Sequence, residues 1–274
     1  MFKKLIAFCI LASSFAHGTT VLHSGNKTYF IPSLESKYLS WDYIQQSMPA
    51  IGSTWTGTAA SSLYAATGTN CTMVSAVAVT STPLTTGTCT TTSAKLVLID
   101  VGHGLALDTF TVTDSKSNII TCNTVIFVHT GTSGTNLCYI INGTVGTLHT
   151  FSFTLTSATT TRAAIGGFPY TYTGATPALD VASAGAFAAG SAVSPGSITP
   201  AGNGELYAVS SAGNGIGASA IVVAAPCAIP TGGSVTAQWD SMIGTNIQTT
   251  GSATNCQVTY TGDSSVIAIA AFFK

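Results

Sequence analysis

The chain has 274 residues, of which 6% are charged and 46% are hydrophobic, and its formal net charge is −1. This composition argues against a nucleic-acid partner, because binding to phosphates needs clustered Lys and Arg side chains. It also argues against a disordered chain, which would lack the apolar residues needed for a packed core.

The first 16 residues, MFKKLIAFCILASSFA, have the order of a secretory signal peptide. Two lysines follow the start, an apolar run extends from Leu5 to Leu11, and small residues stand at Ser14 and Ala16. The apolar run is too short to span a bilayer. We therefore predict cleavage after Ala16 and export of a mature chain with no transmembrane segment, to the extracellular space, the periplasm or a virion.

Residues 17–53 are expected to form an N-terminal arm ahead of the β-rich remainder of the chain. The stretch SLESKYLSWDYIQQSM (33–48) within it contains more helix-forming residues than its surroundings. It is compatible with a short helix or with an irregular arm.

Alternation of apolar and polar residues dominates the rest of the chain and predicts β-strands. No stretch keeps a helical apolar period over three turns, so we expect few helices. Turn sequences separate the strands, including DSKSN (114–118), GNGIGA (213–218) and GDSS (262–265). The predicted strands are AKLVLIDVG (94–102), TFTVTDS (109–115), TFSFTLT (150–156), ELYAVSSAG (205–213), CQVTYTG (256–262) and SVIAIAAFF (265–273).

The chain also repeats itself. AKLVLIDVG aligns with ELYAVSSAG, and the later TFSFTLTSATTTRAAIGGF aligns with NCQVTYTGDSSVIAIAAFF. We therefore expect an all-β fold, a β-sandwich of jelly-roll or immunoglobulin-like type with two pseudo-repeated halves, residues 54–178 and 179–274. Two tandem sandwiches and one larger sandwich both fit the repeat. The absence of a long linker between the copies favours a single body.

Six cysteines remain after the predicted leader, and an even number in an exported chain indicates disulfide bonds. The sequence does not determine their connectivity. The simplest prediction pairs sequence neighbours, and no C-x-x-C motif is present to indicate a zinc ribbon or a redox centre. The predicted pairs are Cys71 with Cys89, Cys122 with Cys138, and Cys227 with Cys256.

Several of these segments resemble a loosely defined set of phage and bacterial extracellular β-sandwich proteins. The resemblance covers roughly residues 54–274 and is carried by a VTDS-x-x-N hairpin, a P-x-x-x-x-E-L entry to the second half, and an ending in AAF. It implies a sandwich fold in phage structural components or surface-exposed accessory proteins. It brings no catalytic residues to this chain.

Cleavage after Ala16 would place His17 at the mature N-terminus, where its amine and ring can bind copper together. Export, a His-Gly start and a β-sandwich resemble the lytic polysaccharide monooxygenases, and this resemblance implies copper as a cofactor. The second ligand would be His103, His129 or His149, with a tyrosine such as Tyr260 near the axial position. The alternative is that His17 is a solvated residue at a processed end.

A second candidate for chemistry is DVGHGLALD, in which His103 lies between Asp100 and Asp108. A carboxylate that orients an imidazole is an acid–base arrangement. However, no G-x-S-x-G motif marks a nucleophile, and a loop after a central strand explains the same residues. The carboxylate of DSKSN is likewise a candidate calcium ligand that an ordinary turn explains as well.

Aromatic side chains on predicted loops could stack on sugar rings, and Trp41, Trp55 and Trp239 are the candidate glycan contacts. Tryptophans in a sandwich also serve as core residues. From the sequence we expect a non-catalytic, exported or virion-associated protein for surface binding, adhesion or assembly, whose partner is a glycan, a cell envelope or another copy of itself. The alternative is a copper-dependent polysaccharide monooxygenase that uses His17.

Overall fold

We describe the protein from a computed structural model, which describes residues 20–24, 27–31, 62–79, 82–104, 109–123, 134–156, 161–215 and 217–274. The chain divides into two compact units, residues 1–56 and 57–274. In the first unit, β1 (Thr20–Ser24) and β2 (Lys27–Ile31) form an antiparallel hairpin. The predicted signal peptide and the stretch 33–48 lie outside the described residues.

The second unit is built from β-strands, and within the described ranges no helix is long and apolar enough to cross a membrane. Its strands fall into two consecutive sets of nine. The first set is β3 (Tyr64–Ala66), β4 (Cys71–Val79), β5 (Leu84–Thr85), β6 (Leu96–His103), β7 (Phe110–Asp114), β8 (Thr121–Asn123), β9 (Gly134–Ile141), β10 (Phe151–Leu155) and β11 (Thr161–Tyr172). The second set is β12 (Leu179–Ala182), β13 (Ala186–Ala188), β14 (Ala192–Val193), β15 (Leu206–Gly213), β16 (Ala220–Val223), β17 (Ser234–Val235), β18 (Ser241–Ile247), β19 (Val258–Thr261) and β20 (Val266–Phe273).

The two sets of strands pair in the same way. In the first half, a six-stranded sheet has the order β3-β11-β6-β9-β8 with β4 also paired to β11, and a three-stranded sheet has the order β5-β10-β7. In the second half, the corresponding orders are β12-β20-β15-β18-β17, with β13 paired to β20, and β14-β19-β16. All of these pairs are antiparallel. The fold is therefore all-β, with two pseudo-repeated halves, as the sequence predicts.

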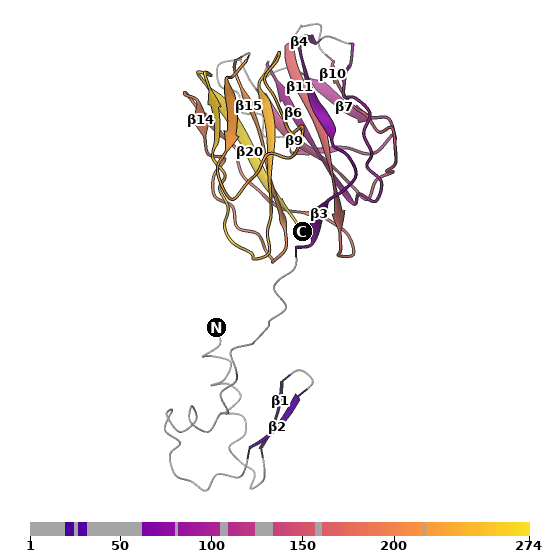
Figure 1. Ribbon diagram of the computed structural model, residues 1–274, viewed down its shortest axis with the longest axis vertical. Helices are drawn as coiled ribbons and strands as arrows, with labels where there is room; N and C mark the ends of the chain where they lie inside the picture. Colours follow the sequence, from indigo (N-terminus) through magenta and orange to yellow (C-terminus); the bar gives the residue numbers. More distant parts are fainter. Residues whose placement is uncertain are drawn as a thin grey trace. The chain divides into compact units, whose positions relative to one another are not determined.

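Within its described residues, the second unit has three hydrophobic cores, one of which joins the two halves. One core lies inside the first half, a second inside the second half, and a third is formed by residues of both six-stranded sheets. The six-stranded sheets therefore face each other, and the three-stranded sheets lie outside them. In Figure 1, β14 and β7 lie on opposite sides, with β20, β15, β6 and β11 between them.

Strand β6 is buried along its whole length because both of its faces are covered. Val97 and Ile99 belong to the core inside the first half, whereas Leu96 and Leu98 belong to the core between the halves. A strand covered on both faces reads as a continuous apolar run, which explains the dense sequence AKLVLIDVG.

The repeat is confirmed, but the sequence alignment of its central strands is wrong by one residue. Leu96 and Leu206 both face the core between the halves. Aligning AKLVLIDVG with ELYAVSSAG instead matches Leu96 with Tyr207, whose side chain belongs to the core inside the second half. A slip of one residue moves every side chain of a strand to the opposite face, and the sequence alone did not reveal it.

The three predicted disulfides are confirmed as Cys71–Cys89, Cys122–Cys138 and Cys227–Cys256. Two of them lie in the first half and one in the second, so none of the three joins the halves. Closing loops of this size stabilises a fold by about 3 kcal/mol for each bond. Contact between the halves depends on side-chain packing and hydrogen bonds instead.

Candidate functional site

The outer sheet of the first half presents a face of hydroxyl side chains. In its two longer strands, less exposed residues alternate with more exposed ones: β7 alternates half-buried and exposed residues, and β10 alternates buried and half-buried ones. The aromatic and aliphatic residues of β10 point inward to the core of the first half, Phe153 among them. The outward residues of both strands, and of the residues directly flanking them, are threonines and serines.

These hydroxyl residues form regular rows across the sheet. The strand register sets Ser152 opposite both Thr85 and Thr113, and Thr154 opposite Thr111. The Oγ atoms of Thr85 and Ser152 are 2.8 Å apart, within hydrogen-bond distance. Within a row, residues on neighbouring strands lie about 4.8 Å apart, and successive rows lie about 6.7 Å apart along the strands. We call this set the hydroxyl face: Thr85, Thr109, Thr111, Thr113, Ser115, Thr150, Ser152, Thr154 and Thr156.

The ends of the hydroxyl face are held by hydrogen bonds of the chain itself. The Thr156 amide and hydroxyl donate to the Thr109 carbonyl at 2.9 and 2.8 Å. At the other end, the Thr150 amide donates to Ser115 Oγ at 3.0 Å. These contacts fix the strand ends beyond β7 and β10, so the rows continue past the strands themselves.

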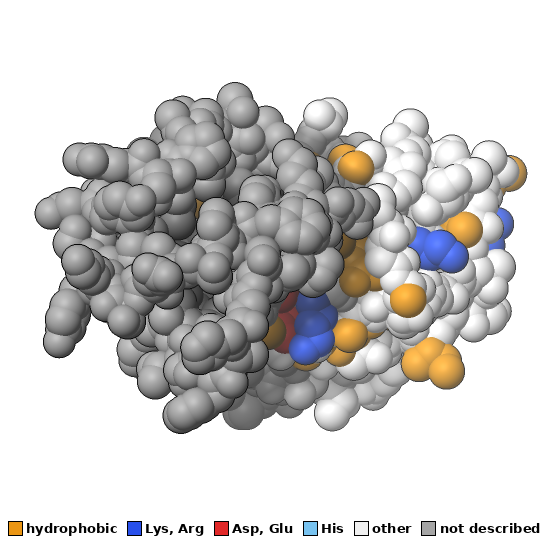
Figure 2. Space-filling model, turned by 90° about the horizontal axis from the view of Figure 1, so that it is seen from below, with side chains coloured by type: hydrophobic (Ala, Val, Ile, Leu, Met, Phe, Trp, Pro, Cys, Tyr) orange, Lys and Arg blue, Asp and Glu red, His pale blue; other side chains and the backbone are white. Residues whose placement is uncertain are grey.

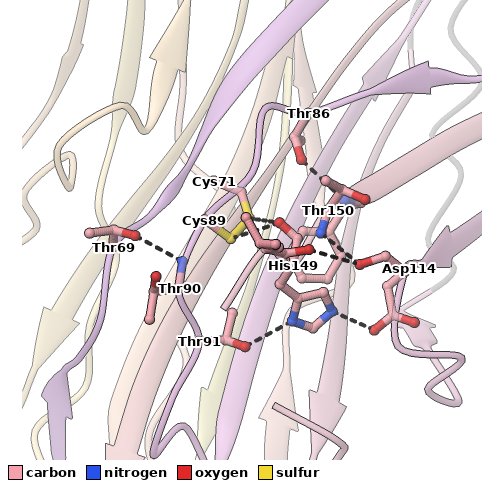
Figure 3. The surroundings of a disulfide bond; sticks show 12 residues. Thr69, Cys71, Thr86, Cys89, Thr90, Thr91, Asp114, His149 and Thr150 are labelled. Atoms are coloured by element: carbon pink, nitrogen blue, oxygen red, sulfur yellow. Dashed lines mark hydrogen bonds and ion pairs between the residues drawn. A yellow bond between two sulfur atoms is a disulfide. The ribbon is translucent and has the colours of Figure 1, made fainter. Parts of the chain in front are cut away.

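A buried histidine supports the same end of the face (Figure 3). The two ring nitrogens of His149 lie 2.8 Å from Thr91 Oγ1 and 2.7 Å from Asp114 Oδ2. Burial acts to raise the pKa of the Asp114 carboxyl, but hydrogen bonds from Asn118 and His149 outweigh it and hold this pKa below its usual range. The Asp114 carboxylate therefore accepts hydrogen bonds from Asn118 of its own turn and is paired with His149. These contacts account for the DSKSN sequence without a calcium ion.

Thr91, His149 and Asp114 have the order hydroxyl, imidazole, carboxylate that is known from hydrolases. Both Thr91 and His149 are 0% exposed, however. The Thr91 hydroxyl oxygen also accepts a hydrogen bond from the Gly146 amide at 3.2 Å. A substrate cannot reach this hydroxyl, so the group positions the loop 143–149 rather than attacking a substrate.

The candidate acid–base pair of Asp100 and His103 is wrong, because strand β6 points the two side chains to opposite faces. Asp100 faces the second half, where Ser210 and Ser241 donate hydrogen bonds to its carboxylate. His103 is the last residue of β6 rather than a loop residue, and its ring faces the first-half core beside Phe110. Residues three apart on a strand point to opposite faces. Asp108 lies outside the described residues.

The copper prediction depends on His17, whose structure is not described, and therefore stays a prediction. His17 and His129 lie outside the described residues. His103 is 1% exposed and its Nε2 lies 3.1 Å from Asn136 Nδ2, while both ring nitrogens of His149 are hydrogen-bonded. Tyr260 is fully buried, with its hydroxyl donating to the Ser211 carbonyl. All three of these described side chains are buried and engaged in hydrogen bonds within the second unit.

The glycan-stacking prediction is wrong for Trp239. This side chain is 2% exposed and belongs to the core between the two halves. The predicted contacts Trp41 and Trp55 lie outside the described residues. Two further aromatic residues, Tyr64 and Tyr170, are also buried in the core between the halves.

Sequence reasoning found the two strands of the hydroxyl face but not the face. TFTVTDS and TFSFTLT were predicted as strands, and their shared alternation of hydroxyl and apolar residues was the available indication. What the sequence did not provide was the pairing of strands that are forty residues apart, which depends on the tertiary fold.

The described surface carries few charges elsewhere as well. In the view of Figure 2, white side chains and backbone prevail over isolated blue and red groups on the part of the surface that is described. Comparisons with protein-family models, with curated proteins and with solved structures find no match for this chain.

Proposed function

We propose that this protein is an exported, non-catalytic binding protein whose hydroxyl face contacts a neutral glycan surface. The observation that carries the proposal is the hydroxyl face itself: nine outward side chains in register, none of them charged. Each hydroxyl can both donate and accept a hydrogen bond. Such a face complements sugar hydroxyl groups, which have the same double capacity.

The rigidity of this face supports a role in binding. Threonine is branched at Cβ and has few rotamers, and an antiparallel sheet fixes the backbone beneath it. Little side-chain entropy is then lost when a ligand binds. The buried ring of His149 and the Cys71–Cys89 disulfide brace the neighbouring loops (Figure 3).

Action outside the cell is part of the proposal. Disulfides persist in oxidising compartments, and three are present here. The N-terminal sequence has the order of a signal peptide. The resemblance to phage and bacterial extracellular sandwich proteins also supports a surface or virion location.

The test is sedimentation of the purified protein with insoluble neutral polysaccharides, together with a glycan array. Lysines at both Thr111 and Thr113 (Thr111→Lys, Thr113→Lys) should reduce binding at least tenfold, because two charged side chains interrupt the rows. The matched control is Ala220→Lys with Val222→Lys on β16, the equivalent strand of the second half, where both residues are exposed. This control should bind as the unmodified protein does.

The proposal fails if the unmodified protein binds no glycan, or if both double variants lose binding equally. Size-exclusion chromatography completes the test. Self-association that Thr111→Lys with Thr113→Lys abolishes, without any glycan bound, would make the face an assembly surface instead.

A further inference from the structure

Three loops meet at one end of the second half. They are the residues after β15, the residues before β18, and the turn between β19 and β20. The Gly213 amide donates to the Asp240 carbonyl at 3.0 Å, and the Asn214 amide donates to the Ser265 carbonyl at 3.1 Å. Asn214 Oδ1 also accepts from the Ser265 amide at 3.2 Å. The backbone of the three loops is therefore tied into one frame.

Two carboxyl groups lie within this frame. Asp240 is 0% exposed, and its two carboxylate oxygens accept hydrogen bonds from the amides of Gly217 and Ala218 at 3.1 and 2.9 Å. Asp263 is 9% exposed and accepts a hydrogen bond from the Gly215 amide. Its side chain also lies within hydrogen-bond distance of the Asp240 carboxyl group, and its Oδ2 atom is buried with no donor pointing to it. A buried carboxylate oxygen without a partner is costly, which indicates a missing ligand.

Glycines make room for the Asp263 carboxyl group. A Cβ atom at Gly213 or at Gly215 would overlap one of the carboxylate oxygens of Asp263. Asp240 Oδ2 would lie 3.3 Å from the same added atom at Gly215. The Gly-Asn-Gly sequence thus lets the backbone pass directly over the two carboxyl groups, which shapes an oxygen-lined cradle.

The charges of the cradle are unbalanced. The ion pairs found among the described residues, His149 with Asp114 and Lys274 with Asp180, lie elsewhere in the chain. Two facing carboxylates without a basic side chain require a proton or a cation between them.

We propose that Asp240 and Asp263 bind a divalent cation, with Ca²⁺ as the preferred ion. Calcium takes six to eight oxygen ligands, carboxylates and waters among them. The free Oδ2 of Asp263 supplies one ligand, Asp240 contributes the facing carboxylate, and water completes the shell. This proposal is independent of the glycan proposal, because it concerns the loops of the second half and not the hydroxyl face.

The experiment uses the full mature chain, stripped of metal with EDTA and then titrated with CaCl₂ against NaCl of equal ionic strength. Extracellular modules bind Ca²⁺ with Kd values of about 0.1 to 1 mM, so 10 mM CaCl₂ should raise Tm by about 3 to 8 °C. Tb³⁺ provides a second readout, because the ion luminesces when a nearby tryptophan is excited and Trp239 precedes Asp240 in the chain.

The test variant is Asp263→Asn, which should fold because it removes the repulsion between the two carboxylates. It should lose both the Tm shift and the Tb³⁺ luminescence. The matched control is Asp180→Asn, whose carboxylate pairs with Lys274, and this variant should keep both responses. Absence of both responses in the unmodified protein would overturn the proposal and leave a shared proton between the carboxyl groups. Equal responses in Asp263→Asn and the unmodified protein would overturn it as well.

Discussion

The two halves share nine strands and every strand pairing, but their outward chemistry differs. In the first half, the three-stranded sheet presents the hydroxyl face. In the second half, the corresponding sheet presents Ala220 and Val222 on β16 and Thr259 and Thr261 on β19. Inward residues are apolar in both. The comparison teaches that the inward alternation specifies the fold, which leaves the outward positions free to diverge in function.

The first prediction concerns the core between the halves and tests whether the two halves depend on each other for stability. Phe168 on β11 is 0% exposed and packs in that core. Phe168→Ala should lower the free energy of unfolding by about 3 to 5 kcal/mol, because it leaves a cavity where the two sheets meet. Denaturant unfolding measures the loss. Hydrogen exchange should accelerate in β15 and β20 as well as in β6. Unchanged protection in the second half would mean that the halves are stable separately.

The disulfides test whether the halves differ in their need for cross-links. Cys227→Ser with Cys256→Ser removes the bond of the second half and should cost about 3 kcal/mol, because the unfolded chain gains freedom. Thermal unfolding of this double variant measures the effect. The comparison is Cys122→Ser with Cys138→Ser in the first half, where Cys71–Cys89 remains. A smaller loss in the first half is the expected outcome, and a larger one would contradict it.

Asp100 links the two halves through a pH-dependent contact. Burial raises the pKa of this carboxyl to about 7, although Ser210 and Ser241 of the second half act to lower it. The folded protein therefore binds this proton more tightly than the unfolded chain does. Stability from Asp100 is greatest at low pH and should fall by about 2 kcal/mol between pH 5 and pH 7. Urea unfolding across this range measures the slope, which Asp100→Asn should reduce.

Asp114 in the first half provides the opposite case. Its pKa is held below the usual range, so its contribution to stability is present at neutral pH and is lost only as the pH falls through the lowered pKa. Asp114→Asn should therefore leave the slope between pH 5 and pH 7 unchanged. An equal slope in Asp100→Asn and the unmodified protein would contradict the role assigned to Asp100.

Much of the fold was predictable from local pattern. Alternation in TFTVTDS and TFSFTLT indicated strands, and sequence neighbours gave the disulfide pairs correctly. Features that depend on which face a residue occupies were not predictable. Asp100 and His103 lie close in sequence yet point to different cores. Trp239 lies on the loop between β17 and β18, but its side chain fills the core between the halves.

The candidate sites show the same limit. GDSS was correctly predicted as the turn between β19 and β20. The sequence did not show that its aspartate, Asp263, lies beside Asp240. The glycines of GNGIGA indicated a turn, and the structure adds that two of them make space for a carboxyl group. Such pairings join residues from separate loops, so no local pattern reports them.

The four-layer order of the sheets has a geometric consequence for a molecule at a surface. Because the six-stranded sheets face each other, the two outer sheets look away from one another (Figure 1). A molecule that adheres through β7 and β10 must turn β16 and β19 toward the surrounding medium. A surface covered by molecules bound through the hydroxyl face would therefore expose the side chains of β16 and β19 to the medium.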